Sequence, residues 1–110
     1  MGLSDLKNTL GKIVIHKEEM RRDIGFLRQA SGNFRAASNV CKRGVDSSRW
    51  AGEAADVFEN RYSELGKSID VQADECERVA GKMEEVIRVF EQTERDIQAQ
   101  INKLLSRGNG

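Results

Sequence analysis

His16, Cys41 and Cys76 are the histidine and the two cysteines of this chain, types that bind zinc and, for cysteine, also act as nucleophiles. A zinc site needs three or four ligands at a fixed geometry, and di-metal helical bundles use Glu-x-x-His motifs on facing helices. His16 is the only histidine, and no Glu-x-x-His motif occurs in the chain. Neither cysteine nor any serine has a recognisable base arranged with it, as a nucleophilic site requires. We therefore expect no metal, no cofactor and no enzymatic activity.

The residues that organise the chain are mostly apolar side chains spaced alternately three and four apart, as in helices that pack along one row, here called the seam. In the first half this row is Leu3, Leu6, Leu10, Ile13, Lys17, Met20, Ile24, Leu27, Ser31, Phe34, Ser38 and Cys41. In the second half it is Phe58, Tyr62, Leu65, Ile69, Gln72, Cys76, Val79, Met83, Val86, Phe90, Thr93, Ile97, Gln100 and Leu104. The chain has no proline, which would break a helix interior. We predict an all-α protein with helices at about 3–41 and about 48–106.

The stretch CKRGVDSSRW separates the two predicted helices. Gly44 can adopt the left-handed conformation that closes a helix, and Lys42 and Arg43 suit the negative end of the helix dipole. The Asp-Ser-Ser run at 46–48 offers N-cap residues for the second helix. A turn at about 42–47 makes the helices antiparallel neighbours. The prediction is a coiled-coil-like hairpin over 1–106 with a flexible tail at 107–110.

Length and charge limit the classes of function. A chain of 110 residues makes one domain, and 18 basic against 18 acidic residues argue against a nucleic-acid binder. No apolar run approaches the roughly 20 residues of a membrane span. The N-terminal MGLSDLKNTL lacks the features of a secretory signal. We expect synthesis in the cytoplasm, with any secretion by a route that needs no cleaved signal peptide.

A lone hairpin of this kind is marginally stable, because each helix buries one stripe and the gain barely offsets the ordering of the chain. The sequence therefore predicts a protein partner, another copy or a different hairpin, that completes a four-helix bundle. In a hairpin centred near residue 45, Cys76 lies opposite about residue 15, ~39 Å from Cys41. A disulfide requires α-carbons within about 7 Å, so only a bond between copies is left as an alternative to two small core residues.

Trp50 and Gly52 stand at the predicted mid-chain turn, followed by Ala54, Ala55 and Phe58. A tryptophan there either closes the end of the seam with a large apolar plate or also forms a docking site. These residues, in a proline-free two-helix chain of this size, resemble the turn of the WXG family. Members are small helical hairpins handled by type VII secretion systems of Gram-positive bacteria. The resemblance covers essentially the whole chain.

Proteins of the WXG type carry an export motif near the end of the second helix: an aromatic residue, three residues, then an acid. The match here is Phe90 to Glu94, with Ile97 and Ile101 on the same helical face, although phenylalanine replaces the usual tyrosine. The alternative is that Phe90 and Ile97 belong to the seam and Glu94 is a solvated charge. If residue 3 pairs near residue 88, residues 90–106 overhang the first helix by about four turns, and this end is free for a receptor.

The partner interface is predicted at residues that flank the seam or extend beyond it. Gly11, Gly25 and Gly32 are spaced by multiples of seven and share one stripe, where a partner helix comes close unless the glycines merely face solvent. A glycine in a helix interior lowers helix stability by about 1 kcal/mol relative to alanine. This cost favours the interpretation that a partner helix packs closely on the stripe. Phe58, Leu104 and Leu105 complete the set.

The function that this resemblance implies is binding. The chain is either itself exported or pairs with the helical N-terminal segment of an LXG-type toxin and escorts it to the type VII secretion ATPase. The sequence does not separate these two roles. An alternative from another class is a homodimeric structural coiled-coil adaptor with no role in secretion. A small helical enzyme is disfavoured because no catalytic constellation is present.

Overall fold

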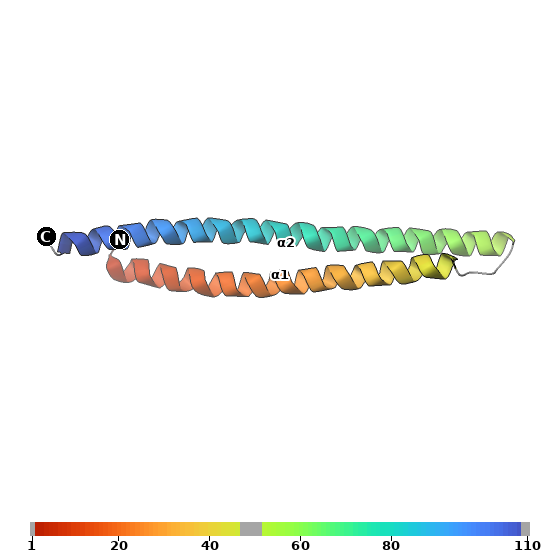
Figure 1. Cartoon of the computed structure of the whole chain (residues 1–110), viewed down its shortest axis with the longest axis horizontal. Helices are drawn as coiled ribbons and strands as arrows, with labels where there is room; N and C mark the ends of the chain where they lie inside the picture. Colours follow the sequence, from red (N-terminus) through yellow and green to blue (C-terminus); the bar gives the residue numbers. More distant parts are fainter. Residues whose placement is uncertain (1, 47–51, 109–110) are drawn as a thin grey trace. The chain divides into compact units, whose positions relative to one another are not determined.

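The computed structural model describes residues 2–46 and 52–108, which form two α-helices (Figure 1). Helix α1 spans Leu3–Asp46 and helix α2 spans Glu53–Gly108. No strand occurs in these two ranges. The predicted all-α class is confirmed, and Trp50 lies outside the described residues.

Each helix begins directly after a glycine. The backbone N–H of Gly2 donates to the Asp5 carboxylate at 3.3 Å, and the carbonyl oxygen of Gly2 accepts from Leu6 at 3.2 Å. Before α2, Gly52 has a φ of 93°, which only glycine adopts without strain. Its carbonyl oxygen accepts from the N–H of Asp56 at 3.2 Å. Acidic residues in both first turns favour these starts through the helix dipole.

The predicted end of the first helix is wrong. Helix α1 does not stop at about residue 41 but continues through Gly44 to Asp46, and Gly52 is the glycine with a left-handed φ among the described residues. A β-carbon built on Gly44 would lie 3.8 Å from the ring of Tyr62. Gly44 therefore lies where an aromatic ring of α2 packs closely on α1, and it does not form a turn.

Packing divides the chain into two compact units, each containing part of both helices. Unit 1 comprises residues 1–24 and 81–110, and unit 2 comprises residues 25–80. In unit 2, three ion pairs join α1 to α2: Arg28–Glu77, Arg35–Asp74 and Lys42–Asp70. The residue number falls along α2 as it rises along α1, so the two helices are antiparallel and the predicted hairpin is confirmed.

Unit 1 is paired along its length, which corrects the expected overhang. Lys17 forms an ion pair with Glu94, and Leu6 lines a surface hollow together with Leu104. Ile101 is only 5% exposed. The start of α1 therefore lies against residues near 104 and not near 88. The difference follows from the position of the turn, because a turn at Gly44 would place Leu6 opposite about residue 85, about five helical turns away from Leu104.

The predicted seam of α1 is confirmed. Its buried positions are Leu6, Ile13, Ile24, Ser31, Ser38 and Cys41. The hydroxyl of Ser38 donates to the carbonyl oxygen of Gly66 at 3.1 Å, which satisfies a fully buried polar group. Phe34, predicted in this row, is 37% exposed.

The seam of α2 lies one residue later than predicted at half of its positions. The buried residues of α2 are Ala55, Gly66, Ala73, Ala80, Ile87 and Ile101. Leu65 and Val86, which directly precede two of them, are 49% and 42% exposed. Glycine and alanine bring the backbone of α2 close to α1, so the larger side chains at the preceding positions lie on the flank of the seam.

Candidate partner-binding surface

Unit 2 has a row of ion pairs along one side of its seam, here called the ladder face. Arg28 lies 3.1 Å from Glu77, Arg35 lies 2.8 Å from Asp74, and Lys42 lies 3.1 Å from Asp70, each measured from nitrogen to carboxylate oxygen. All three basic residues are on α1 and all three acidic residues are on α2. These charges neutralise one another within the hairpin, so the ladder face offers a partner little unpaired charge.

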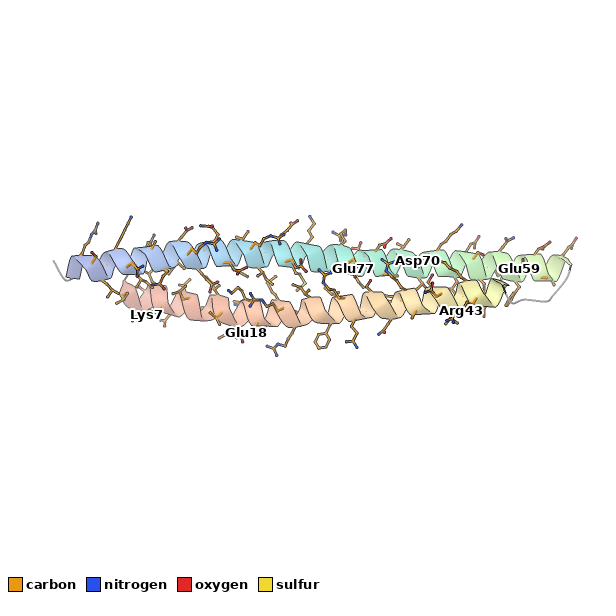
Figure 2. All side chains as sticks on the ribbon, in the orientation of Figure 1. Lys7, Glu18, Arg43, Glu59, Asp70 and Glu77 are labelled. Atoms are coloured by element: carbon orange, nitrogen blue, oxygen red, sulfur yellow. The ribbon has the colours of Figure 1, made fainter. Side chains whose placement is uncertain are left out.

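The sequence contains a signal for this face that the apolar pattern does not use. Basic residues recur every seven positions on α1 at Arg21, Arg28, Arg35 and Lys42, and acidic residues recur every seven on α2 at Asp70, Glu77, Glu84 and Glu91. Asp70 and Glu77 extend from α2 in Figure 2. A spacing of seven keeps residues on one side of a packed helix, so the two rows together predict which sides of the helices face each other.

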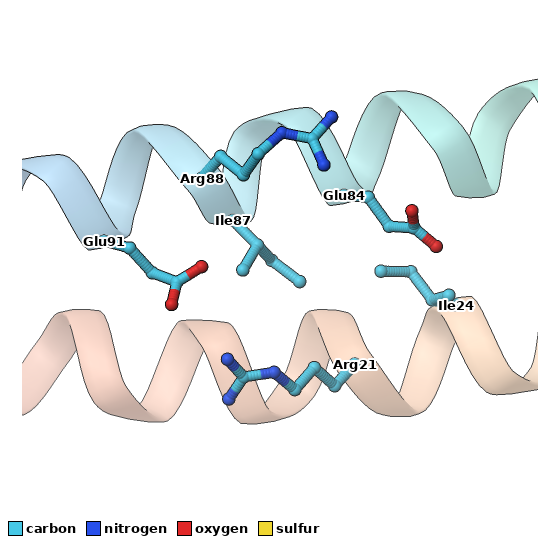
Figure 3. A pocket seen from close by; sticks show the side chains of 6 residues that line it. All are labelled: Arg21, Ile24, Glu84, Ile87, Arg88 and Glu91. Carbon is cyan, nitrogen blue, oxygen red and sulfur yellow. The ribbon is translucent and has the colours of Figure 1, made fainter.

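In unit 1 the same two rows line an open hollow beside the seam. Its residues are Arg21, Ile24, Glu84, Ile87, Arg88 and Glu91. Figure 3 shows Ile24 and Ile87 pointing into the space between the helices, with Arg21 and Glu91 reaching from opposite helices. The lining carries both signs of charge, so this hollow has no preference for an anionic or a cationic ligand.

Asp70, an acidic residue of the ladder face, has a pKa that its neighbours lower. The Ser38 hydroxyl and the Lys42 ammonium hold the pKa of Asp70 below its ordinary value. The single proton of that hydroxyl serves either Asp70 or the Gly66 carbonyl oxygen, which lies 3.1 Å away. On the outer side of α2, hydrogen bonds from Arg78 likewise lower the pKa of Glu75. Both groups stay ionised at neutral pH.

The opposite side of the unit 2 seam is apolar and is here called the apolar face. At about 100° per residue, Asp70 and Glu77 lie about 40° to one side of the seam positions Gly66 and Ala73. Residues that lie one before or three after positions 59, 66, 73 and 80 of this heptad row are on the other side, and they include Tyr62, Leu65, Ile69, Gln72, Cys76 and Val79. None of the six is charged. Tyr62 is 36% exposed, and its ring packs against Phe58 with centroids 4.4 Å apart.

Unit 2 thus buries small residues and exposes large ones. The buried side chains of unit 2 belong to Ser31, Ser38, Cys41, Ala55, Ala73 and Ala80. By contrast, Leu65 is 49% exposed and Phe26 is 67% exposed. Burial of a large apolar side chain contributes about 1.5–3 kcal/mol to stability. The isolated hairpin lacks this contribution for the large apolar side chains that it leaves exposed.

The four residues of the candidate export motif all lie in unit 1, where α1 contacts them to different extents. Glu94 is paired with Lys17, with side chains 22% and 12% exposed. Ile101 is buried, and Phe90 and Ile97 are half-buried. The motif therefore coincides with the hairpin's own seam, and Glu94 is not a solvated charge.

The predicted interface residues are scattered rather than gathered on one patch. Gly11, Gly25 and Gly32 are exposed, and a β-carbon built on any of them meets no atom within 4 Å. Leu104 and Leu105 are 37% and 50% exposed at the end of α2, in unit 1. Phe58 is half-buried in unit 2, beside Tyr62.

The residues considered for chemistry lie apart. The Nδ1 atom of the exposed His16 lies 3.8 Å from a carboxylate oxygen of Glu19. The described ranges contain no group of three side chains that could hold a metal ion. Cys41 and Cys76 are free thiols, and both lie in unit 2, not at the spacing predicted. Cys41 lies beside Gly66, and Cys76 is ten residues farther along α2, about 15 Å. Neither described helix is long and apolar enough to cross a bilayer.

Comparison of the chain with family models, curated proteins and solved structures found no match. The likeness to the WXG turn therefore rests on the motif residues alone.

Proposed function

We propose that this protein acts by binding another helical protein in a type VII secretion pathway, either as an exported WXG-type protein or as the targeting partner of a larger toxin. The observation that supports binding is the distribution of side chains in unit 2. Small residues fill the seam, while uncharged large residues such as Leu65 remain on the surface of an otherwise highly charged chain. Exposed, uncharged large residues along one side of a helix are typical of helices that pack in a bundle.

Support for the secretion pathway comes from the motif residues. Gly52, the glycine of the tryptophan–glycine motif, has a left-handed φ directly before α2. The antiparallel hairpin on either side of it is the architecture that the resemblance implies. The partner in this pathway is either a second helical hairpin, such as an LXG-type N-terminal segment, or the secretion ATPase.

The direct test is secretion from the native host with the type VII ATPase intact or deleted. We expect the protein in the culture medium only when the ATPase is present. If the chain instead escorts a toxin, we expect the toxin's export to require this chain. Absence of both effects would reject the pathway and leave the homodimeric adaptor as the alternative.

The structure provides a matched control for the export motif. Glu94 and Lys17 form one ion pair, so a purely structural role predicts that Glu94→Gln and Lys17→Gln reduce export equally, through loss of folding. A signal role predicts that Glu94→Gln and Phe90→Ala abolish export whereas Lys17→Gln does not. Helix content, measured by circular dichroism, must be the same in the three variants for the comparison to count.

A further inference from the structure

We propose that the first part of α1 is a detachable strap over a binding strip on α2, and that the strip binds a partner helix of the strap's own chemistry when the strap separates from it. The strap is defined here as residues 3–24, the part of α1 that belongs to unit 1. The strip is the stretch of α2 at residues 87–104 that lies against the strap. The inference rests on the proposed function only in that the protein binds another helical protein, and it names the chemistry of that partner.

The strap contacts the strip at several places within unit 1. The ammonium of Lys17 forms an ion pair with the carboxylate of Glu94. Leu6, near the start of the strap, lines a surface hollow together with Leu104. At the other end of the strap, isoleucines of the two helices point into the space between them (Figure 3). The strip is therefore a covered surface, and the strap is its occupant.

The strap shows which kind of helix the strip accepts. Its buried side chains belong to Leu6, Ile13 and Ile24, which are large and apolar. Between them, Lys17 places its ammonium against Glu94, and the two side chains are 12% and 22% exposed. A helix without this cation would leave the carboxylate largely buried and unpaired, which carries a large desolvation cost. The partner therefore has large apolar residues along one side and a cation in the position of Lys17.

The strap is held less firmly than its length suggests. Three of its side chains are buried, and its partly buried ion pair contributes little net stability, because the loss of hydration offsets the attraction. The boundary between the two units falls directly after the strap, at Gly25, and a glycine weakens a helix at that point. Regions with few buried apolar contacts open locally at a lower free energy than the rest of a structure. We expect the strap to separate from the strip while unit 2 stays paired.

The strap and a partner helix compete for one strip, so the strap acts as an autoinhibitory contact. A partner binds only the open fraction of the molecules, and its apparent affinity is lowered in proportion to that fraction. The strap of another copy has the same chemistry, but the attached strap is present at an effective concentration of about millimolar order. At micromolar protein concentration the strap therefore closes on its own chain.

The test uses the full chain and a synthetic, fluorescent peptide of residues 3–24 as the probe, with binding measured by fluorescence anisotropy. We expect Lys17→Glu in the chain to raise the affinity for this peptide at least about tenfold, because the repelled strap leaves Glu94 to the lysine of the peptide. The matched control is Lys12→Glu, which makes the same charge change at an exposed position of the strap. It should change the affinity less than about twofold. Equal effects of the two substitutions overturn the proposal.

Reversal of the charge on the strip tests the selection of the partner. In a chain with Glu94→Lys, we expect a peptide that carries Lys17→Glu to bind more tightly than the unchanged peptide. The chain with both Lys17→Glu and Glu94→Lys regains an ion pair with its own strap, so its affinity for either peptide should fall below that of the chain with Glu94→Lys alone. Equal binding of the two peptides to the Glu94→Lys chain contradicts the proposal, since residue 94 would then not select the partner.

Amide hydrogen exchange, followed by mass spectrometry, separates opening of the strap from global unfolding. We expect residues 3–24 to exchange faster than residues 25–46 of the same helix, and Lys17→Glu to speed exchange in the strap and the strip while unit 2 keeps its rates. Equally faster exchange in both units would mean that the variant unfolds as a whole, and overturns the proposal. So does an exchange rate of the strap that falls as the protein concentration rises, because the strap would then lie on another copy.

These outcomes are separable from those of the secretion test. A chain whose strap is displaced by the peptide but that is not exported through type VII components rejects the pathway and keeps the strap. A chain that is exported through these components, but whose Lys17→Glu and Lys12→Glu variants bind the peptide alike, rejects the strap and keeps the pathway.

Discussion

The ammonium of Lys17 lies 2.5 Å from a carboxylate oxygen of Glu94, in a seam where the neighbouring positions on α1 include Ile13 and Ile24. The two side chains are 12% and 22% exposed. An ion pair in such surroundings contributes little net stability, but removal of one partner leaves the other charge poorly solvated. Its most direct effect is on register, because any slip of the helices places a charge against an apolar residue.

The Lys17–Glu94 pair should therefore show strong coupling. We expect Lys17→Met alone to lower the free energy of unfolding by about 2 kcal/mol, within the range for a polar group left without its partner, and Lys17→Met/Glu94→Leu to recover most of this loss. Urea unfolding followed by circular dichroism measures both. A double variant as unstable as the single one would show that the pair is not coupled.

The position of the α2 seam is tested by two adjacent residues. Ala73 is fully buried, whereas Gln72 is exposed. We expect Ala73→Leu to destabilise the chain by about 1–3 kcal/mol through overpacking, and Gln72→Leu to be nearly neutral. If the apolar pattern of the sequence gave the seam correctly, the order would be reversed, with Gln72→Leu stabilising. Thermal unfolding of the two variants distinguishes these cases.

The exposed glycines of α1 should be replaceable. Neither Gly25 nor Gly32 has an atom within 4 Å of the position of an added β-carbon. We expect Gly25→Ala and Gly32→Ala to raise the free energy of unfolding by about 1 kcal/mol each. The control is Gly52→Ala, which should destabilise because φ is 93°. If a partner helix approaches this stripe, the alanine variants gain stability but lose binding to that partner.

The carboxylates of unit 2 predict a loss of stability in acid. The pKa of Asp70 is lowered by Ser38 and Lys42, and that of Glu75 by Arg78. A group with a lowered folded pKa stabilises the fold above its unfolded pKa, and this contribution is lost as the pH falls through the folded pKa. We expect the urea midpoint to decline below about pH 4. Asp70→Asn should show a smaller decline, and an unchanged decline would contradict this assignment.

The seam of α1 was predictable because its small residues fall within an apolar rhythm. Ser31, Ser38 and Cys41 belong to the three-four pattern set by Leu6, Ile13 and Ile24, and all six are buried. On α2 the three-four spacing of the larger apolar residues does not coincide with the buried positions. Gly66, Ala73 and Ala80 carry little hydrophobicity, yet close packing of helices selects small residues, so the larger neighbours at 65 and 79 define a parallel row on the flank.

The pairing of the helices was not predictable from the glycine at 44. A glycine in a helix interior and a glycine that ends a helix have the same identity, and the environment decides between them. Here the ring of Tyr62 against Gly44 accounts for the residue without a turn. The heptad-spaced charges at Arg28, Arg35 and Lys42 and their acidic counterparts on α2 would have indicated the correct facing sides.

The distribution of seam residues between the units has a consequence for the order of folding. The branched aliphatic residues Ile13, Ile24, Ile87 and Ile101 gather in unit 1, and contacts there close the longest loops in the chain. Contacts in unit 2, such as Lys42 to Asp70 across 28 positions, close much shorter loops at a lower entropic cost. We expect the chain to fold from the end near the turn towards its termini, so that the contacts of the first turns of α1 form last. Truncation of these turns should therefore speed unfolding and leave the folding rate nearly unchanged.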